Sequence, residues 1–135
     1  MTAVVAGVLM RGDGCVLISQ RRKEQSQGLK WEFPGGKIES VESPEEALER
    51  ELREELGILT RTGKLLMAIR GRVEGKDLLL LYYESICLEG EPRAIDANKI
   101  EFAPISRLSE YDFGKIDREF VERHFLNRQL KRENV

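Results

Sequence analysis

The sequence contains few of the residues that form cross-links or histidine-based sites. It has two cysteines, Cys15 and Cys87, and one histidine, His124, among 135 residues. Two cysteines are too few for a disulfide framework, and both lie in apolar, strand-like runs, so we expect buried free thiols. One histidine excludes a metal site built from several histidines, and we expect it at the surface or at the edge of the core.

Long apolar runs and an excess of positive charge are also absent. No run approaches the roughly 20 apolar residues that span a bilayer, and the first residues do not resemble a secretory signal. The net charge is −2, which gives no general attraction to a nucleic-acid backbone. We therefore expect one globular domain over residues 1–135, a cytoplasmic monomer or homodimer that binds neither membranes nor nucleic-acid polymers.

The clearest helix signal lies between Ser43 and Gly57. Ser43 is suited to cap a helix, Pro44 fits the first helical position, and Glu46 completes a capping box. Gly57 follows the last turn, where a left-handed residue commonly ends a helix. Apolar residues repeat every four positions and predict one buried stripe: Leu48, Leu52 and Leu56.

Beside this stripe the predicted helix carries an acidic face. Glu51, Glu54 and Glu55 occupy positions i, i+3 and i+4, where like charges cost roughly 0.2–0.5 kcal/mol per pair. Arg50 is placed to pair with Glu54, which leaves two carboxylates uncompensated. A hard divalent cation such as Mg²⁺ or Mn²⁺ would relieve the repulsion. The alternative, a solvated acidic helix, is the more common meaning of such a charge run.

The wider spacing identifies a known motif. Gly36, five residues, Glu42, seven residues and then the run from Arg50 to Ile58 fill every specified position of the Nudix box, which this chain resembles. The segment Trp31–Lys37 is similar to the lead-in of the MutT branch, which acts on nucleoside triphosphates. The resemblance implies a divalent-metal hydrolase with an α/β fold, the Nudix α/β/α sandwich. In that fold a mixed sheet lies between the box helix and a C-terminal helix.

The resemblance also implies the metal ligands and the catalytic groups. The ligands would be the carbonyl of Gly36 and three carboxylates: Glu51, Glu54 and Glu55. Arg50 would orient the glutamates, and Glu42 would support the metal site. Glu51 or Asp96 would take the proton from water. Many relatives carry glutamate where this chain has Asp96, and Glu101 is a second carboxylate nearby.

Substrate contacts are implied at four further positions. Arg21 would meet the substrate phosphates, with Arg22 as the second candidate, and Lys37 would reach the pyrophosphate. Asp117 either contacts the nucleobase edge or caps the terminal helix. An ionised carboxylate there only accepts hydrogen bonds, whereas a protonated one also donates.

The remaining pattern predicts the other elements. Val4–Met10 and Cys15–Ser19 predict a β-hairpin around an Asp-Gly turn. Leu65–Ile69 and Leu78–Leu88 predict strands joined by a polar connection, with Tyr82 or Tyr83 in a base pocket and the other in the core. Ile100–Ala103 resembles the late Nudix strand. A terminal helix over Asp117–Lys131 would bury four residues: Phe120, Val121, Phe125 and Leu130.

Three kinds of function are compatible with these residues. The first is Mg²⁺-dependent hydrolysis of a nucleoside triphosphate to the monophosphate and pyrophosphate, with 8-oxo-dGTP first and CTP-like nucleotides second. The second is a Nudix hydrolase for ADP-ribose or a dinucleoside polyphosphate. The third is a nucleotide-binding sensor without catalysis, against which the intact set of box carboxylates argues.

Overall fold

Two β-sheets lie at the centre of the computed structural model, which describes residues 1–126. The strands are β1 (Thr2–Leu9), β2 (Cys15–Gln20), β3 (Trp31–Glu32), β4 (Gly35–Lys37), β5 (Leu59–Val73), β6 (Lys76–Glu89) and β7 (Lys99–Pro104). The helical segments are α1 (Pro44–Leu56), η1 (Ile105–Glu110), α2 (Lys115–Phe120) and η2 (Val121–Leu126).

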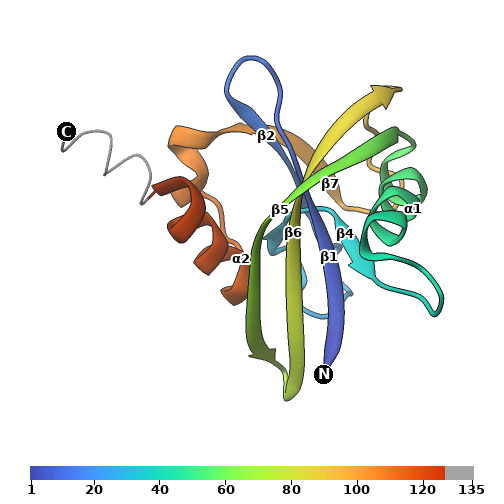
Figure 1. The fold of residues 1–135 in the computed structure, drawn as a ribbon. Coiled ribbons are helices and arrows are strands. Elements are labelled where there is room, and N and C mark those ends of the chain that lie inside the picture. Colours follow the sequence, from blue (N-terminus) through green and yellow to red (C-terminus); the bar gives the residue numbers. More distant parts are fainter. Residues whose placement is uncertain (127–135) are drawn as a thin grey trace, which may run out of the picture.

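The sheets lie between helices. The larger sheet has the strand order β4-β1-β6-β5, and the smaller has the order β3-β2-β7. In the larger sheet β1 runs parallel to β6, whereas its other pairs are antiparallel. Helix α1 and helix α2 lie on opposite sides (Figure 1). The predicted α/β sandwich with a mixed sheet is therefore confirmed, with a separate antiparallel sheet beside it.

The predicted first hairpin is only partly correct. Both runs are strands, and the turn closes through the Arg11 amide, which donates to the Cys15 carbonyl at 2.8 Å. However, β1 and β2 share only the isolated bridge between Met10 and Val16, and each then joins a different sheet. Both strands are buried almost throughout, so each needs cover on two faces, which two packed sheets provide.

The hairpin of β5 and β6 is longer than the predicted strands Leu65–Ile69 and Leu78–Leu88. β5 begins directly after α1 and pairs with β6 up to Val73 opposite Lys76, so the turn is only Glu74-Gly75. Most of the expected polar connection is therefore strand, and Arg72 pairs with Asp77 across it at 3.2 Å. A charged cross-strand pair of this kind allows polar residues to continue a ladder.

Two apolar clusters fill the space between sheets and helices. One contains the predicted α1 stripe, Leu48, Leu52 and Leu56, which is confirmed as buried together with Tyr83. The other lies under α2 and η2 and contains Tyr82. Successive residues of a strand point to opposite faces, so the two tyrosines of β6 serve different clusters.

The C-terminal part differs from its prediction at its start. Gly114 is the N-cap of α2, without a side-chain cap, and Asp117 is the third helical residue, so the prediction of a cap at Asp117 is wrong. Phe120, Val121 and Phe125 are buried as predicted. The predicted helix beyond residue 126, with Leu130, lies outside the described residues.

Two expectations for single residues need correction. Cys15 is a buried free thiol as predicted, but Cys87 is exposed, because residues 86–89 at the end of β6 are exposed. His124 is 9% exposed and stacks on Phe120 with ring centroids 5.0 Å apart, so the surface alternative is wrong and the residue lies against the core. Over residues 1–126, every helix is too short or too polar to cross a membrane.

Candidate active site

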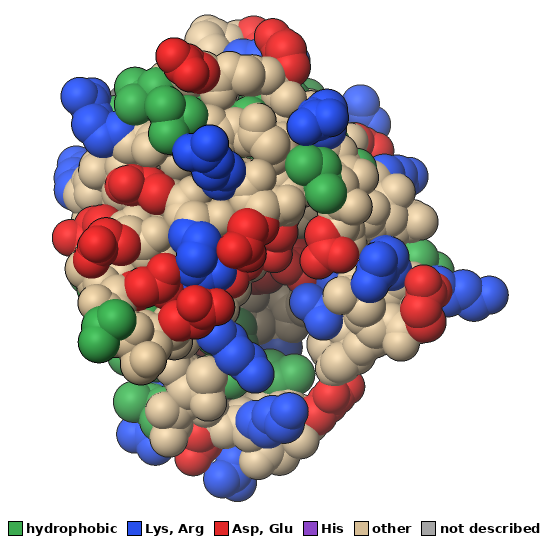
Figure 2. All heavy atoms as spheres, turned by 90° about the vertical axis from the view of Figure 1, so that its right-hand side faces the viewer, with side chains coloured by type: hydrophobic (Ala, Val, Ile, Leu, Met, Phe, Trp, Pro, Cys, Tyr) green, Lys and Arg blue, Asp and Glu red, His purple; other side chains and the backbone are tan. Residues whose placement is uncertain are grey.

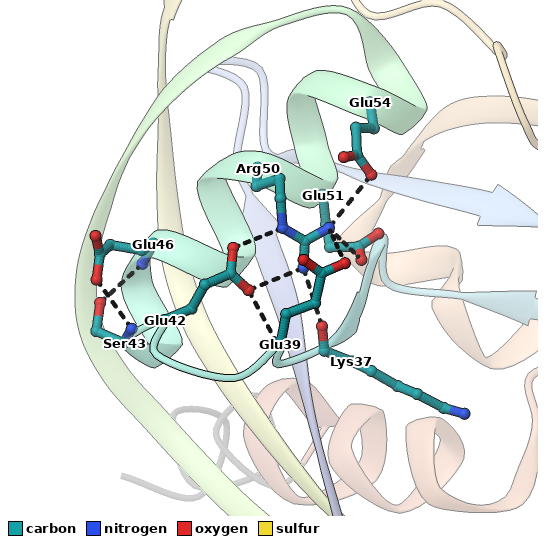
Figure 3. Close-up of polar contacts among 8 residues, drawn as sticks. All are labelled: Lys37, Glu39, Glu42, Ser43, Glu46, Arg50, Glu51 and Glu54. Carbon is teal, nitrogen blue, oxygen red and sulfur yellow. Dashed lines mark hydrogen bonds and ion pairs between the residues drawn. The ribbon is translucent and has the colours of Figure 1, made fainter.

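The start and end of α1 fix the register of the box glutamates. The Ser43 hydroxyl accepts from the Glu46 amide at 3.0 Å, and the Glu46 carboxylate accepts from the Ser43 amide at 2.9 Å (Figure 3). Gly57 has φ 70°, and its amide donates to the Arg53 carbonyl. The predicted capping box and left-handed C-cap are both confirmed.

Arg50 is the centre of a carboxylate network on the exposed side of α1 (Figure 3). Its guanidinium donates twice to Glu42, at 2.6 and 3.0 Å, and also to Glu51 at 3.0 Å and Glu54 at 3.3 Å. It also donates to the Lys37 carbonyl at 3.1 Å, which ties α1 to β4. The bond to Arg50 lowers the pKa of Glu42. Arg50 therefore holds two of the predicted ligand carboxylates and Glu42 in one arrangement.

Gly36 lies directly against Glu51. A Cβ atom at Gly36 would lie 2.6 Å from both carboxylate oxygens of Glu51, so a side chain there would force the carboxylate to move. The Glu51 side chain is only 16% exposed, whereas that of Glu54 is 60% exposed. The absence of a side chain at Gly36 thus lets the half-buried Glu51 carboxylate lie directly against the backbone of β4.

The surroundings of Glu55 disfavour its ionised form. Burial, followed by the negative charges of Glu51 and Glu32 and a hydrogen bond to Glu51, raises its pKa. Two adjacent carboxylates in a partly buried site resist joint ionisation. A cation bound between them would remove that cost.

The donor set fits a hard divalent metal ion. Carboxylate and carbonyl oxygens are the ligands of Mg²⁺ and Mn²⁺, and Glu51, Glu55 and the Gly36 backbone supply them next to one another. Within residues 1–126, no three acidic, histidine or cysteine side chains already converge into a metal-binding group. The exposed Glu54 must therefore turn toward the other two if all three glutamates bind metal.

A cleft of about 470 Å³ opens beside these groups. Its wall contains five of the predicted site residues: Arg21, Gly36, Lys37, Glu55 and Asp117. Figure 2 shows the α1 side of the molecule, where acidic and basic side chains surround a hollow in the surface. Residues from β4, α1 and α2 and Arg21 just after β2, far apart in the sequence, thus share one cavity.

Asp96 lies in a small adjoining cavity of about 50 Å³, which shares Arg21, Glu32 and Glu55 with the cleft. Arg22 lines neither cavity and pairs with Asp96 at 3.5 Å. Of the two predicted carboxylates near β7, Asp96 therefore faces the box helix. Glu101 instead accepts from the Tyr111 hydroxyl at 2.7 Å.

Glu32 is a site residue that sequence reasoning missed. It is the first acidic group along the chain to line the cleft, and it pairs with Arg21 at 2.9 Å. Burial raises the pKa of Glu32, and Arg21 opposes this. A signal was present, because Glu32 stands between Trp31 and Phe33, both buried on the core side. Alternation along a strand then turns Glu32 to the opposite side.

Asp117, on α2, lines the same cleft as Glu55 of α1. Its Oδ1 atom accepts from the Tyr82 hydroxyl at 2.6 Å. Burial raises the pKa of Asp117 to about 7, opposed by the bond from Tyr82. Both protonation states of this carboxyl are therefore accessible near neutral pH.

Comparisons with known proteins agree with this geometry. The family model described as NUDIX domain matches residues 1–124, and the chain belongs to the Nudix family. It is a hydrolase of this family, whose members act on nucleotide substrates and need a divalent metal ion.

Two curated relatives and one solved structure illustrate which proteins the chain is similar to. The chain is 45% identical to the CTP pyrophosphohydrolase of Escherichia coli over 76 residues, 56% of each chain. It is 36% identical to the putative 8-oxo-dGTP diphosphatase 2 of Mycobacterium tuberculosis over 125 residues, 87% of this chain and 84% of the relative. The solution structure of the E. coli ORF135 protein has a TM-score of 0.78 at 32% identity. That match covers 90% of this chain and 86% of the other.

Proposed function

We propose that this protein hydrolyses a nucleoside triphosphate to the monophosphate and pyrophosphate, with Mg²⁺ as the metal ion. The observation that carries the proposal is the common cleft. It joins the cations Arg21 and Lys37, the ligand groups Gly36 and Glu55, and Asp117. Cations suit the phosphates, oxygen ligands suit the metal, and a carboxyl suits a nucleobase edge.

The side chains divide the work of hydrolysis as follows. Glu51, Glu54, Glu55 and the Gly36 carbonyl would hold metal, which neutralises phosphate charge and makes water a better nucleophile. Arg50 keeps Glu51 and Glu54 in place through its bonds of 3.0 and 3.3 Å.

Two groups are candidates to accept the proton from water, Glu51 and Asp96. Asp96 lines the cavity next to Glu55 and is 58% exposed. Glu51 is only 16% exposed and accepts from Arg50 at 3.0 Å, whereas the pair of Asp96 with Arg22 is longer, at 3.5 Å. This difference favours Asp96 as the general base.

For the base, we propose 8-oxo-dGTP first, which would make the enzyme a sanitiser of the cytoplasmic nucleotide pool. The M. tuberculosis relative, which aligns over most of both chains, carries that activity in its name. CTP-like nucleotides are the second candidate, because the E. coli relative that is 45% identical over 76 residues is named CTP pyrophosphohydrolase. A carboxyl with a pKa of about 7 at Asp117 is compatible with either base edge.

The test is product analysis across a nucleotide panel. Wild type would be incubated with 8-oxo-dGTP, dGTP, CTP, 5-methyl-dCTP, ADP-ribose and a dinucleoside polyphosphate, in Mg²⁺, in Mn²⁺ and in chelator. We expect a monophosphate and pyrophosphate from the triphosphates, dependence on metal, and loss of most turnover in Glu54→Gln and Glu55→Gln. Cleavage of ADP-ribose alone would mean that the substrate is ADP-ribose and not a nucleoside triphosphate. Tight nucleotide binding without any product would make it a sensor.

A further inference from the structure

The Tyr82 hydroxyl is held in one position by its surroundings. Its ring is fully buried and stacks on Phe120, with centroids 3.9 Å apart and planes 2° apart. Phe33 meets the same ring edge-on at 6.1 Å. A fully buried ring with one stacked and one edge-on aromatic neighbour has little rotational freedom, so the position of its hydroxyl oxygen is fixed.

This hydroxyl points at a carboxyl of the cleft. It donates to Asp117 Oδ1 at 2.6 Å, a short distance typical of an O–H bond to a carboxylate. The backbone of Phe33 also hydrogen-bonds this carboxyl. A carboxylate has about four acceptor positions. The described residues provide these two bonds to it, and because Asp117 lines the cleft, the remaining acceptor positions can serve a ligand there.

We propose that Tyr82 is a specificity-determining positioning residue, which keeps the Asp117 carboxyl a hydrogen-bond acceptor and so favours nucleobases that present N–H donors. The inference rests on the proposed function, because it assumes that a nucleobase occupies the Asp117 end of the cleft. Tyr82 itself is too deeply buried to touch the substrate, so it acts only through Asp117.

The chemistry of base edges explains the direction of the effect. A guanine-type edge offers two N–H donors, from the ring nitrogen and the exocyclic amine, and suits a carboxylate that only accepts. A cytosine-type edge offers one amine donor beside a ring-nitrogen acceptor, and suits a protonated carboxyl, which both accepts and donates. A fixed donor on Oδ1 stabilises the ionised form and disfavours the protonated one.

Other charged side chains around Asp117 shift its pKa in opposite directions. Glu32 on β3 raises the pKa of Asp117, and Arg21, which follows β2, lowers it; these two groups are paired at 2.9 Å. Further charged side chains line the same cleft: Lys30, Lys37, Glu55, Glu74, Lys76 and Lys115. Among these neighbours, the bond from Tyr82 opposes the effect of burial most strongly.

The first experiment compares Tyr82→Phe with Tyr83→Phe. Both remove one hydroxyl from β6, but Tyr83 lies on the opposite face, in the α1 cluster. kcat/KM would be measured from pH 5.5 to 9 for 8-oxo-dGTP, dGTP, CTP and 5-methyl-dCTP. At pH 7.5 we expect Tyr82→Phe to lower the guanine-to-cytosine ratio by about tenfold, the size of one hydrogen bond to a charged group. The pH at which the preference changes should rise, while Tyr83→Phe keeps the wild-type profile.

A double-variant cycle separates this role from a general loss of packing. Asp117→Asn carries an amide that does not titrate, so its base ratio should not depend on pH. Tyr82→Phe should then leave the ratio unchanged in the Asp117→Asn background. A shift of the ratio that persists without Asp117, or that also occurs in Tyr83→Phe, overturns the proposal.

A spectroscopic readout tests the link without any turnover. The ¹³C signal of the Asp117 carboxyl would be titrated in wild type and in Tyr82→Phe, and its pKa should rise in the variant. An unchanged pKa overturns the proposal. If wild type hydrolyses none of the panel, the proposed function fails and this titration still decides the role of Tyr82. If Tyr82→Phe does not fold, the wild-type signals of Asp117 Cγ and Tyr82 Cζ must titrate at the same pH.

Discussion

At the scale of single residues, the pair of Arg21 and Glu32 links binding to stability. Their side chains are only 32% and 24% exposed and lie 2.9 Å apart. Arg21 also donates to the Ser26 carbonyl at 2.6 Å, so it holds the segment after β2. Removal of one partner from such a pair leaves the other charge without compensation, which costs more than the pair itself contributes.

We therefore predict that Arg21→Ala lowers both stability and nucleotide affinity. The free energy of unfolding should fall by about 1–3 kcal/mol, because the Glu32 carboxylate loses its partner. The second substitution Glu32→Gln should restore stability, since a neutral amide tolerates burial better, but it should not restore KM. Thermal unfolding and KM measured on both variants check this. Recovery of KM together with stability would mean that Arg21 has no phosphate contact.

Arg22 is the matched control for that experiment. It is 47% exposed, and its one ion pair within residues 1–126 is with the exposed Asp96, at 3.5 Å. Arg22→Ala should change stability by less than about 0.5 kcal/mol, as for most surface positions. A larger rise of KM in Arg22→Ala than in Arg21→Ala would transfer the phosphate role to Arg22.

At the scale of elements, two adjacent glycines of β4 allow close approach to two different neighbours, Gly36 to α1 and Gly35 to β1. A Cβ at Gly36 would meet the end of a side chain, Glu51, whereas a Cβ at Gly35 would meet the backbone of Val5 and Ala6 on β1. A side-chain end can move aside, but a paired strand cannot. The two glycines therefore protect different properties of the protein.

We predict that Gly36→Ala mainly impairs catalysis and Gly35→Ala mainly impairs folding. Gly36→Ala should displace the Glu51 carboxylate and lower kcat at saturating Mg²⁺, with a small change in the melting temperature. Gly35→Ala should cost about 1–3 kcal/mol of unfolding free energy by overpacking against β1. Circular dichroism melts and steady-state kinetics distinguish the two. A wild-type kcat in Gly36→Ala would argue against Glu51 as a metal ligand.

The elements differ in how well the sequence alone predicts them. α1 was predictable to the residue because its signals are local: Ser43, Pro44 and Glu46 at the start and Gly57 at the end. The separation of β1 from β2 was not predictable, because the turn between them resembles that of an ordinary hairpin. Only the need of two buried strands for cover on both faces places them in different sheets.

The same contrast holds for the candidate site. Glu51, Glu54 and Glu55 follow from spacing along one helix, and Gly36 follows from the motif. The neighbours of Arg21 and Asp117 could not follow from spacing, because Glu32 and Tyr82 come from other strands. Contacts between elements depend on sheet order, which local patterns do not encode.

At the scale of the whole molecule, the site has a measurable effect on stability through protons. Burial raises the pKa of Glu55, with Glu51 as the second cause, and burial raises that of Asp117 to about 7. For an acid whose folded pKa is raised, the folded state holds its proton longer than the unfolded state. Stability is then highest below the ordinary values near 4 and falls as pH rises toward the folded pKa.

A bound divalent cation reverses this dependence, because it binds the ionised carboxylates and competes with protons. We predict that the metal-free protein loses on the order of 1–2 kcal/mol of unfolding free energy between pH 5.5 and pH 8. The stabilisation by excess Mg²⁺ should grow over the same range.

Glu55→Gln should flatten the pH dependence of the metal-free stability and remove most of the stabilisation by Mg²⁺. Glu84→Gln, which changes an exposed carboxylate on β6 with a weak pair at 3.9 Å, should keep both. Chemical denaturation at each pH, with and without Mg²⁺, measures all three proteins. A metal-free stability that rises from pH 5.5 to pH 8 would mean that Glu55 and Asp117 are not the groups that dominate the linkage.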